Sequence, residues 1–100
     1  MTVVKDEIRA AIDKELAAAK EVHGLHHSRA EQFAVMLEEL EEAKEELEAA
    51  EKNLRIMFGH IRINHDKHAH EFALRVADAA ERLACEAVQL AAVAKKELKK

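Results

Sequence analysis

Apolar residues recur at alternating steps of three and four positions between Phe33 and Ile61. This spacing keeps them along one face of an α-helix, and no strand has such a period. We call the set the heptad stripe; it comprises Phe33, Met36, Leu40, Ala43, Leu47, Ala50, Leu54, Met57 and Ile61. The pattern predicts one long helix, roughly 50 Å in length at about 1.5 Å per residue.

The composition favours helices throughout the chain. There is no proline, glycine occurs only at positions 24 and 59, and Ala, Glu, Leu and Lys dominate. Such a composition is typical of long helices and coiled coils. We predict three helices, near residues 3–23, 28–60 and 65–98.

Capping residues set the first two predicted boundaries. Thr2 is positioned to cap the first helix, and Gly24 to end it. Ser28 and Glu31 have the spacing of a capping box, in which each side chain bonds the backbone N–H of the other residue. The second helix is therefore expected to begin at Ser28. Phe33 is interpreted as a core residue because it is the first member of the heptad stripe.

The second turn has weaker signals. Gly59 is the predicted end of the second helix, and either Asn64 or Asp66 is the predicted cap of the third.

These elements predict an all-α fold, an antiparallel three-helix bundle with two long helices, as a single helical domain over residues 1–100. The first helix, nearer 30 Å long, covers only the half of the hairpin that contains residues 28–48. Several apolar residues near the hairpin tip lack cover, and exposed apolar patches usually mark interfaces. We expect a homodimer or homotetramer, a larger helical bundle whose interface includes Leu54, Met57, Phe58 and Phe72.

Net charge, hydropathy and cysteine content limit the partners and the cellular location that we expect for this protein. The net charge is −4 at pH 7, with acids and bases interspersed, which argues against a surface for duplex nucleic acid. No apolar run is long enough to cross a bilayer, and the N-terminus has no secretory apolar core. The single Cys85 has apolar neighbours, so we interpret it as a buried small hydrophobe. We expect a cytoplasmic protein that does not bind membranes.

Glu86 is an acid in an otherwise apolar segment. It and Gln89 are the only polar side chains between Leu83 and Ala94. An unpaired carboxylate is costly to bury, so a cation, a metal or a proton is expected beside it. In an antiparallel hairpin turning near residues 62–63, Glu86 faces Glu39. Glu42 is one helical turn from Glu39, so three carboxylates are expected to converge and share Mg²⁺.

A simpler alternative stays open. Glu39 and Glu42 would then belong to the solvated face of a Glu-rich helix, while Glu86 pairs with a Lys or Arg of the first helix or of a neighbouring chain.

Two segments carry a resemblance to a known family. His27–Glu42 and Glu86–Ala94 resemble the all-α nucleoside triphosphate pyrophosphohydrolases of the MazG-like family, particularly small phage-associated members. The resemblance implies that Glu38-Glu39-x-x-Glu42 and Glu86-x-x-Gln89 hold Mg²⁺, with Glu39 and Glu42 catalytic. The family has Asp at the position of Gln89, and the neutral amide should weaken metal binding.

The resemblance also implies hydrolysis of a nucleoside triphosphate with release of pyrophosphate. Basic side chains should steady the phosphates, and the candidates are Lys14, Lys20, Arg29 and Arg82. The main alternative is a noncatalytic helical assembly or adaptor protein that acts through its coiled-coil face.

The histidines suggest a third function, a metal or pH sensor. They cluster at the two turns, where His23 with His27 and His65 with His68 have spacings that can share a transition metal. Solvated turn histidines are the favoured interpretation.

Overall fold

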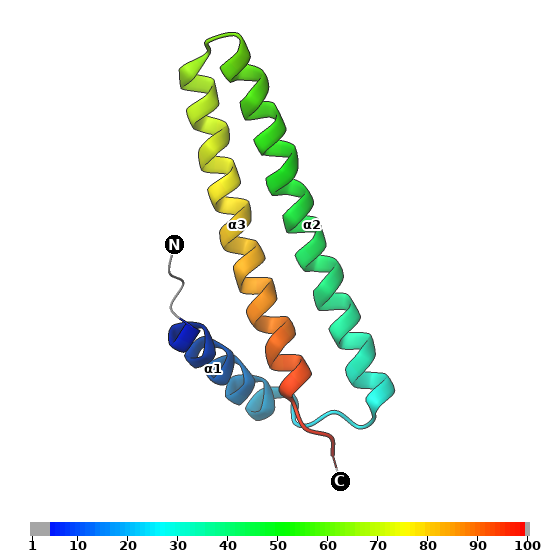
Figure 1. Ribbon diagram of the computed structural model, residues 1–100. Helices are drawn as coiled ribbons and strands as arrows, with labels where there is room; N and C mark the ends of the chain where they lie inside the picture. Colours follow the sequence, from blue (N-terminus) through cyan, green and yellow to red (C-terminus); the bar gives the residue numbers. More distant parts are fainter. Residues whose placement is uncertain (1–4, 100) are drawn as a thin grey trace. The chain divides into compact units, whose positions relative to one another are not determined.

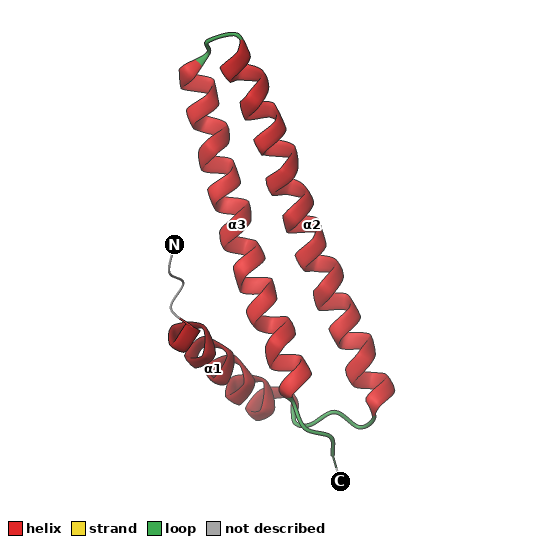
Figure 2. Ribbon diagram, in the orientation of Figure 1, coloured by secondary structure: helices red, strands yellow, loops and turns green. Residues whose placement is uncertain are grey.

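The computed structural model describes residues 5–99, and three helices account for most of them (Figures 1 and 2). They are α1 (Lys5–His23), α2 (Arg29–Arg62) and α3 (Asp66–Lys95). The predicted all-α fold with two long helices is confirmed. Thr2 and the first positions of the predicted first helix lie outside the described residues.

The chain forms two compact units. The described part of the first unit lies within Met1–Glu41 and Glu86–Lys100, so it contains α1, the start of α2 and the end of α3. The second unit, Glu42–Cys85, is a hairpin in which the remaining parts of α2 and α3 run side by side (green to yellow in Figure 1). The prediction of a single domain over residues 1–100 stays a prediction.

Small side chains occupy the most buried apolar positions. Among the described residues, the buried hydrophobic ones are all alanines: Ala43, Ala69 and Ala79 in the second unit and Ala92 in the first. Alanine lets helix backbones approach closely, but it buries little apolar area, so the core is modest.

The heptad stripe divides into two sets. Met36, Ala50 and Met57 are half-buried and Ala43 is buried. The alternating members, seven residues apart, are exposed: Phe33, Leu40, Leu47, Leu54 and Ile61. The prediction that Phe33 is a core residue is wrong, since 62% of its surface is exposed. We call the buried and half-buried members the inner set and the exposed members the outer set.

The first turn follows the predicted capping signals. Gly24 has a φ of 67° and donates a backbone hydrogen bond to the Lys20 carbonyl oxygen at 3.0 Å, which is the left-handed arrangement that ends many helices. The Glu31 N–H donates to the Ser28 hydroxyl at 3.1 Å, so Ser28 caps α2. The Glu31 side chain instead approaches His26, with 3.7 Å between its Oε1 atom and the His26 Nδ1 atom.

The second turn differs from the prediction. α2 continues through Gly59 to Arg62, and Asn64, at a φ of 59°, is the left-handed residue. The Asn64 N–H donates to Ile61 at 3.1 Å and the His65 N–H to His60 at 2.9 Å, the pair of bonds of a Schellman motif. Asn64 therefore ends α2, while Asp66 lies in the first turn of α3. The His65 carbonyl accepts the first bond of α3, from Ala69.

The last helix ends earlier than expected, at Lys95 instead of near residue 98. The Gln32 side-chain amide donates to three carbonyl oxygens at this end: Val93 (3.1 Å), Ala94 (3.3 Å) and Lys96 (3.1 Å). The chain beyond it forms an isolated parallel β-bridge between Leu98 and His26. These bonds satisfy carbonyls that a longer helix would have used, so the backbone leaves the helix there.

Cys85 is exposed. Its predicted burial is wrong, because the apolar neighbours in the sequence occupy other faces of α3.

Candidate functional site

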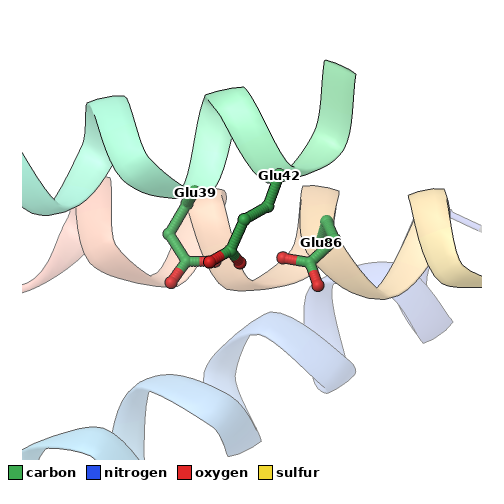
Figure 3. A group of neighbouring side chains, drawn as sticks. All are labelled: Glu39, Glu42 and Glu86. Carbon is green, nitrogen blue, oxygen red and sulfur yellow. The ribbon is translucent and has the colours of Figure 1, made fainter. Parts of the chain in front are cut away.

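Three carboxylates converge between α2 and α3. One carboxyl oxygen from each of Glu39, Glu42 and Glu86 lies within 4.8 Å of the other two. Glu39 and Glu86 belong to the first unit, and Glu42, the first residue of the second, follows Glu39 by one turn of the same helix. Figure 3 shows the three carboxyl groups turned toward the same space. We call them the acidic cluster.

Burial distinguishes this cluster from surface acids. All three residues are half-buried, whereas their neighbours Glu38 and Glu41 are exposed. The Oε2 atom of Glu86 is buried and has no hydrogen-bond partner among the described residues. An ionised carboxylate in this position needs a positive charge or a proton close to it. Carboxylate oxygens at this spacing suit a hard cation such as Mg²⁺ or Ca²⁺.

A cavity of about 430 Å³, lined by both polar and apolar side chains, lies within the first unit. It is bounded by α1, the start of α2 and the end of α3. The lining residues are Glu15, Ala19, His23, His26, Glu31, Val35, Glu39, Gln89, Ala92, Val93 and Lys96. Glu39 belongs to both this cavity and the acidic cluster, so a ligand in the cavity can contact the Glu39 carboxylate. Gln89 contributes to the cavity wall.

None of the four basic residues expected to hold phosphates lines this cavity, and their part in phosphate binding stays a prediction. The Arg82 Nε atom donates to Glu46 at 2.8 Å, and this hydrogen bond and the Glu46 charge raise the pKa of the Arg82 guanidinium above its ordinary value. Arg29 donates to the Gln32 side-chain oxygen at 2.8 Å. Lys14 is exposed and Lys20 half-buried, and neither lines the cavity.

The cation that does line the cavity is Lys96, only 8% exposed. The position of Lys96 depends on where α3 ends and on the hydrogen bond from the Gln32 side chain to the Lys96 carbonyl oxygen. No local sequence pattern indicates either feature. Gln32, 5% exposed, was likewise missed as a structural residue, although it follows the capping signal directly.

The histidines at the first turn are not all solvated. His26 is only 3% exposed, which corrects the interpretation of that cluster, whereas His23 and His27 are exposed. The backbone of His26 pairs with the C-terminal segment in the β-bridge to Leu98.

At the second turn, the rings of His60, His65 and His68 lie 5.2–5.9 Å apart, and His60 stacks on Phe72. Among residues 5–99, the acidic cluster is the only set of three or more His, Cys, Asp or Glu with ligand atoms close enough to share a metal.

The expected interface residues lie in the second unit. Leu54 and Phe58 are 55% and 60% exposed, while Met57 and Phe72 are half-buried. Leu54, Met57, Phe58 and Ile61 line an open apolar hollow on α2 together with Arg55. Their part in an interface stays a prediction.

Within residues 5–99 no helix combines the length and the apolar character needed to cross a membrane. Comparison with protein-family models, curated proteins and solved structures found no match.

Proposed function

We propose that the acidic cluster binds Mg²⁺ and that the protein is a nucleoside triphosphate pyrophosphohydrolase of the MazG-like type. The observation that carries the proposal is the convergence of Glu39, Glu42 and Glu86. Their positions match the Glu38-Glu39-x-x-Glu42 and Glu86-x-x-Gln89 patterns that resemble this family. The buried Oε2 atom of Glu86 supports a cation at this place, since that oxygen has no hydrogen-bond partner among the described residues.

Each residue then has a chemical role. Bound Mg²⁺ supplies positive charge that polarises the phosphates. Glu39, Glu42 and Glu86 would hold the ion, and either Glu39 or Glu42 would accept a proton from the attacking water. The water oxygen bonds to phosphorus as the bond to the pyrophosphate leaving group breaks. Gln89 adds no negative charge, which lowers the expected affinity for the cation.

Calorimetric titration tests the proposal. The wild-type protein should give a binding heat when titrated with Mg²⁺, and again when titrated with nucleoside triphosphates in the presence of Mg²⁺. A separate assay should detect release of pyrophosphate from at least one nucleoside triphosphate. Glu86→Gln should abolish both binding signals. Glu41→Gln, an exposed acid on the same helix, should leave them unchanged. A wild-type protein that binds neither Mg²⁺ nor any nucleotide would refute the proposal.

The stability of the Glu86→Gln variant distinguishes a metal-binding role of Glu86 from a structural ion pair. If Glu86 is kept for metal binding, its burial is a stability cost, so the variant should melt at the same or a higher temperature. If Glu86 is half of a buried ion pair, the change strands its partner and lowers the free energy of unfolding by about 3–5 kcal/mol. A large fall in melting temperature, with no ligand-dependent shift in the wild type, would contradict the catalytic proposal.

A second candidate function is helical assembly, with a second copy of the chain as partner. The outer set of the heptad stripe supports it, because five large apolar residues are exposed at seven-residue spacing along α2. Charge favours an antiparallel pairing of two α2 helices. The acids of α2 end at Glu51, whereas the charged residues from Lys52 to Arg62 are basic. Each acidic stretch would then lie against a basic one.

A further inference from the structure

A second hollow of the first unit is strongly basic. It has a volume of about 630 Å³ and is lined by Arg29 of α2 and by the chain from Ala94 to Lys99. Arg29, Lys95, Lys96 and Lys99 supply four positive charges and Glu97 supplies one negative charge, a net charge of +3. The whole chain, in contrast, has a net charge of −4. We call this place the basic hollow.

Hydrogen bonds hold the segments that carry these cations together. The Lys99 N–H donates to the His26 carbonyl oxygen at 2.6 Å, and the Lys96 carbonyl oxygen accepts from the Gln32 side chain at 3.1 Å. Arg29, the first residue of α2, donates to the Gln32 Oε1 atom at 2.8 Å. Like charges that the fold keeps close to one another repel, so an anion among them would be stabilised.

Lys96 is the buried cation of the basic hollow. It is only 8% exposed, and within residues 5–99 its side chain forms no hydrogen bond or ion pair. Its Nζ atom is nevertheless not among the fully buried polar atoms of the described residues, so a ligand can reach it. Lysine is almost never buried to this extent unless its charge is paired. A buried cation without a protein partner at the wall of a hollow therefore points to an anionic ligand.

The donors of the basic hollow suit phosphate oxygens. Each lysine ammonium has three N–H donors, and the Arg29 guanidinium has further donors beyond the one that bonds Gln32. Arginine binds phosphate oxygens in pairs, and lysine binds them as a point charge. The volume of about 630 Å³ falls within the range of small-molecule sites. A net charge of +3 favours a ligand with several negative charges over a monovalent anion.

We propose that the basic hollow binds a small anion that carries two or more linked phosphate groups. Arg29, Lys95, Lys96 and Lys99 contact its oxygens, and Lys96 supplies the buried charge. The proposal does not depend on the proposed enzymatic function, because none of these residues belongs to the acidic cluster. All of them lie in the first unit.

Calorimetric titration in EDTA, at constant ionic strength, tests the proposal without a divalent ion. The probes are pyrophosphate, tripolyphosphate and sulfate. We expect tripolyphosphate to bind about tenfold or more tightly than sulfate, since it offers more charged oxygens to the same donors. Tripolyphosphate should also raise the melting temperature, and its affinity should fall as sodium chloride is added. No binding of either phosphate compound, or an affinity equal to that of sulfate, would overturn the proposal.

Adenosine triphosphate in the same buffer distinguishes two sources of the phosphate chain. An affinity equal to that of tripolyphosphate supports recognition of the phosphates alone. An affinity about tenfold higher supports a nucleotide as the source, since further contacts would then be made. Excess Mg²⁺ neutralises part of the phosphate charge and should weaken binding of both compounds. Binding that strengthens with Mg²⁺ would contradict a site built from cations.

Variants assign the binding to the basic hollow. Lys96→Met keeps much of the apolar stem and removes the charge, so it should weaken tripolyphosphate binding about tenfold or more. Lys95→Gln combined with Lys99→Gln changes two exposed residues and should also weaken it. Lys52→Gln, an exposed lysine of the second unit, is the matched control and should bind as the wild type. Circular dichroism identifies a variant that fails to fold. Unchanged affinity in the double variant and in a folded Lys96→Met would overturn the proposal.

The two proposals fail in different ways. Glu86→Gln should bind tripolyphosphate in EDTA as tightly as the wild type, and loss of this binding would refute a separate phosphate site. Tripolyphosphate binding without any release of pyrophosphate from nucleotides would support the basic hollow and contradict the enzymatic proposal. Mg²⁺-dependent pyrophosphate release by a protein that binds no phosphate compound in EDTA would leave the enzyme and refute the basic hollow as a site.

Discussion

The side-chain nitrogen of Gln32 lies 3.1 Å from the carbonyl oxygen of Lys96, and this bond joins the first turn of α2 to the residue after α3. Arg29 donates to the Gln32 Oε1 atom, which orients the amide so that its nitrogen faces the carbonyls. A side chain of α2 thus caps α3, and the same contact positions Lys96 in the cavity wall.

Replacing Gln32 should destabilise the first unit. Gln32→Ala leaves the carbonyls at the end of α3 without their donor, and we expect a loss of about 1–3 kcal/mol in the free energy of unfolding. Gln32→Glu should cost more, because its carboxylate would face the same carbonyl oxygens. Urea denaturation measures both variants, and Glu41→Ala, at an exposed site, serves as the control. Unchanged stability of both Gln32 variants would mean that the cap contributes nothing.

The two glycines should respond to alanine in opposite directions. An added Cβ meets no atom within 4 Å at either position, so the backbone conformation alone decides the effect. Gly59 lies inside α2, and Gly59→Ala should raise the free energy of unfolding by about 0.5–1 kcal/mol. Gly24 has a φ of 67°, which alanine adopts only with strain. Gly24→Ala should therefore lower the free energy of unfolding by about 1–2 kcal/mol.

Thermal melts of these two variants and the wild type check the prediction, since about 1 kcal/mol corresponds to roughly 4–8 °C in a domain of this size. Changes of the same sign would contradict the assignment of the two backbone conformations.

The exposed apolar residues of α2 should mediate self-association. The wild type is expected to be a dimer or tetramer by light scattering at micromolar concentration. Leu54→Glu combined with Phe58→Glu should shift it toward the monomer, because two carboxylates would have to be buried in the interface. Ala80→Glu, which adds a charge at an exposed site of α3, should not. A wild-type monomer would exclude this interface.

Removal of divalent ions should leave the fold intact. Mg²⁺ sites of this kind are completed by water and substrate phosphates and do not form a structural cage. We therefore expect the far-ultraviolet circular dichroism spectrum and the melting temperature to change little with EDTA. Loss of helicity on chelation would indicate a structural metal, and the histidines at the two turns would then be the first residues to substitute.

The sequence predicts the helices and the acidic cluster for clear physical reasons. The heptad stripe defines α2 because apolar spacing is a local property. The approach of Glu86 to Glu39 follows from antiparallel pairing, in which facing residue numbers have a constant sum. The sequence predicts the end of α2 at Gly59 because glycine is the commoner terminator, yet at this turn Asn64 is the residue with the left-handed conformation.

The residues that sequence reasoning missed depend on distant contacts. The backbone of His26 forms hydrogen bonds with Glu97 and Lys99, and the Gln32 side chain forms hydrogen bonds with carbonyls of residues 93–96. Neither residue carries a pattern in its own segment that indicates the partner. The same holds for Phe33, whose place in the heptad stripe is correct but whose exposure depends on which side of the stripe meets the other helices.

The bridge between His26 and Leu98 implies an order in which the two units fold during synthesis of the chain. Residues 26–32 are synthesised long before residues 93–99, with which they form hydrogen bonds. The hairpin of Glu42–Cys85 emerges in between and depends on contacts that are closer in sequence, so it can form while the first unit still lacks its last segment. The cavity and its buried histidine are therefore expected to be completed last, and pulsed hydrogen exchange during refolding should protect Lys99 later than the amides of the hairpin.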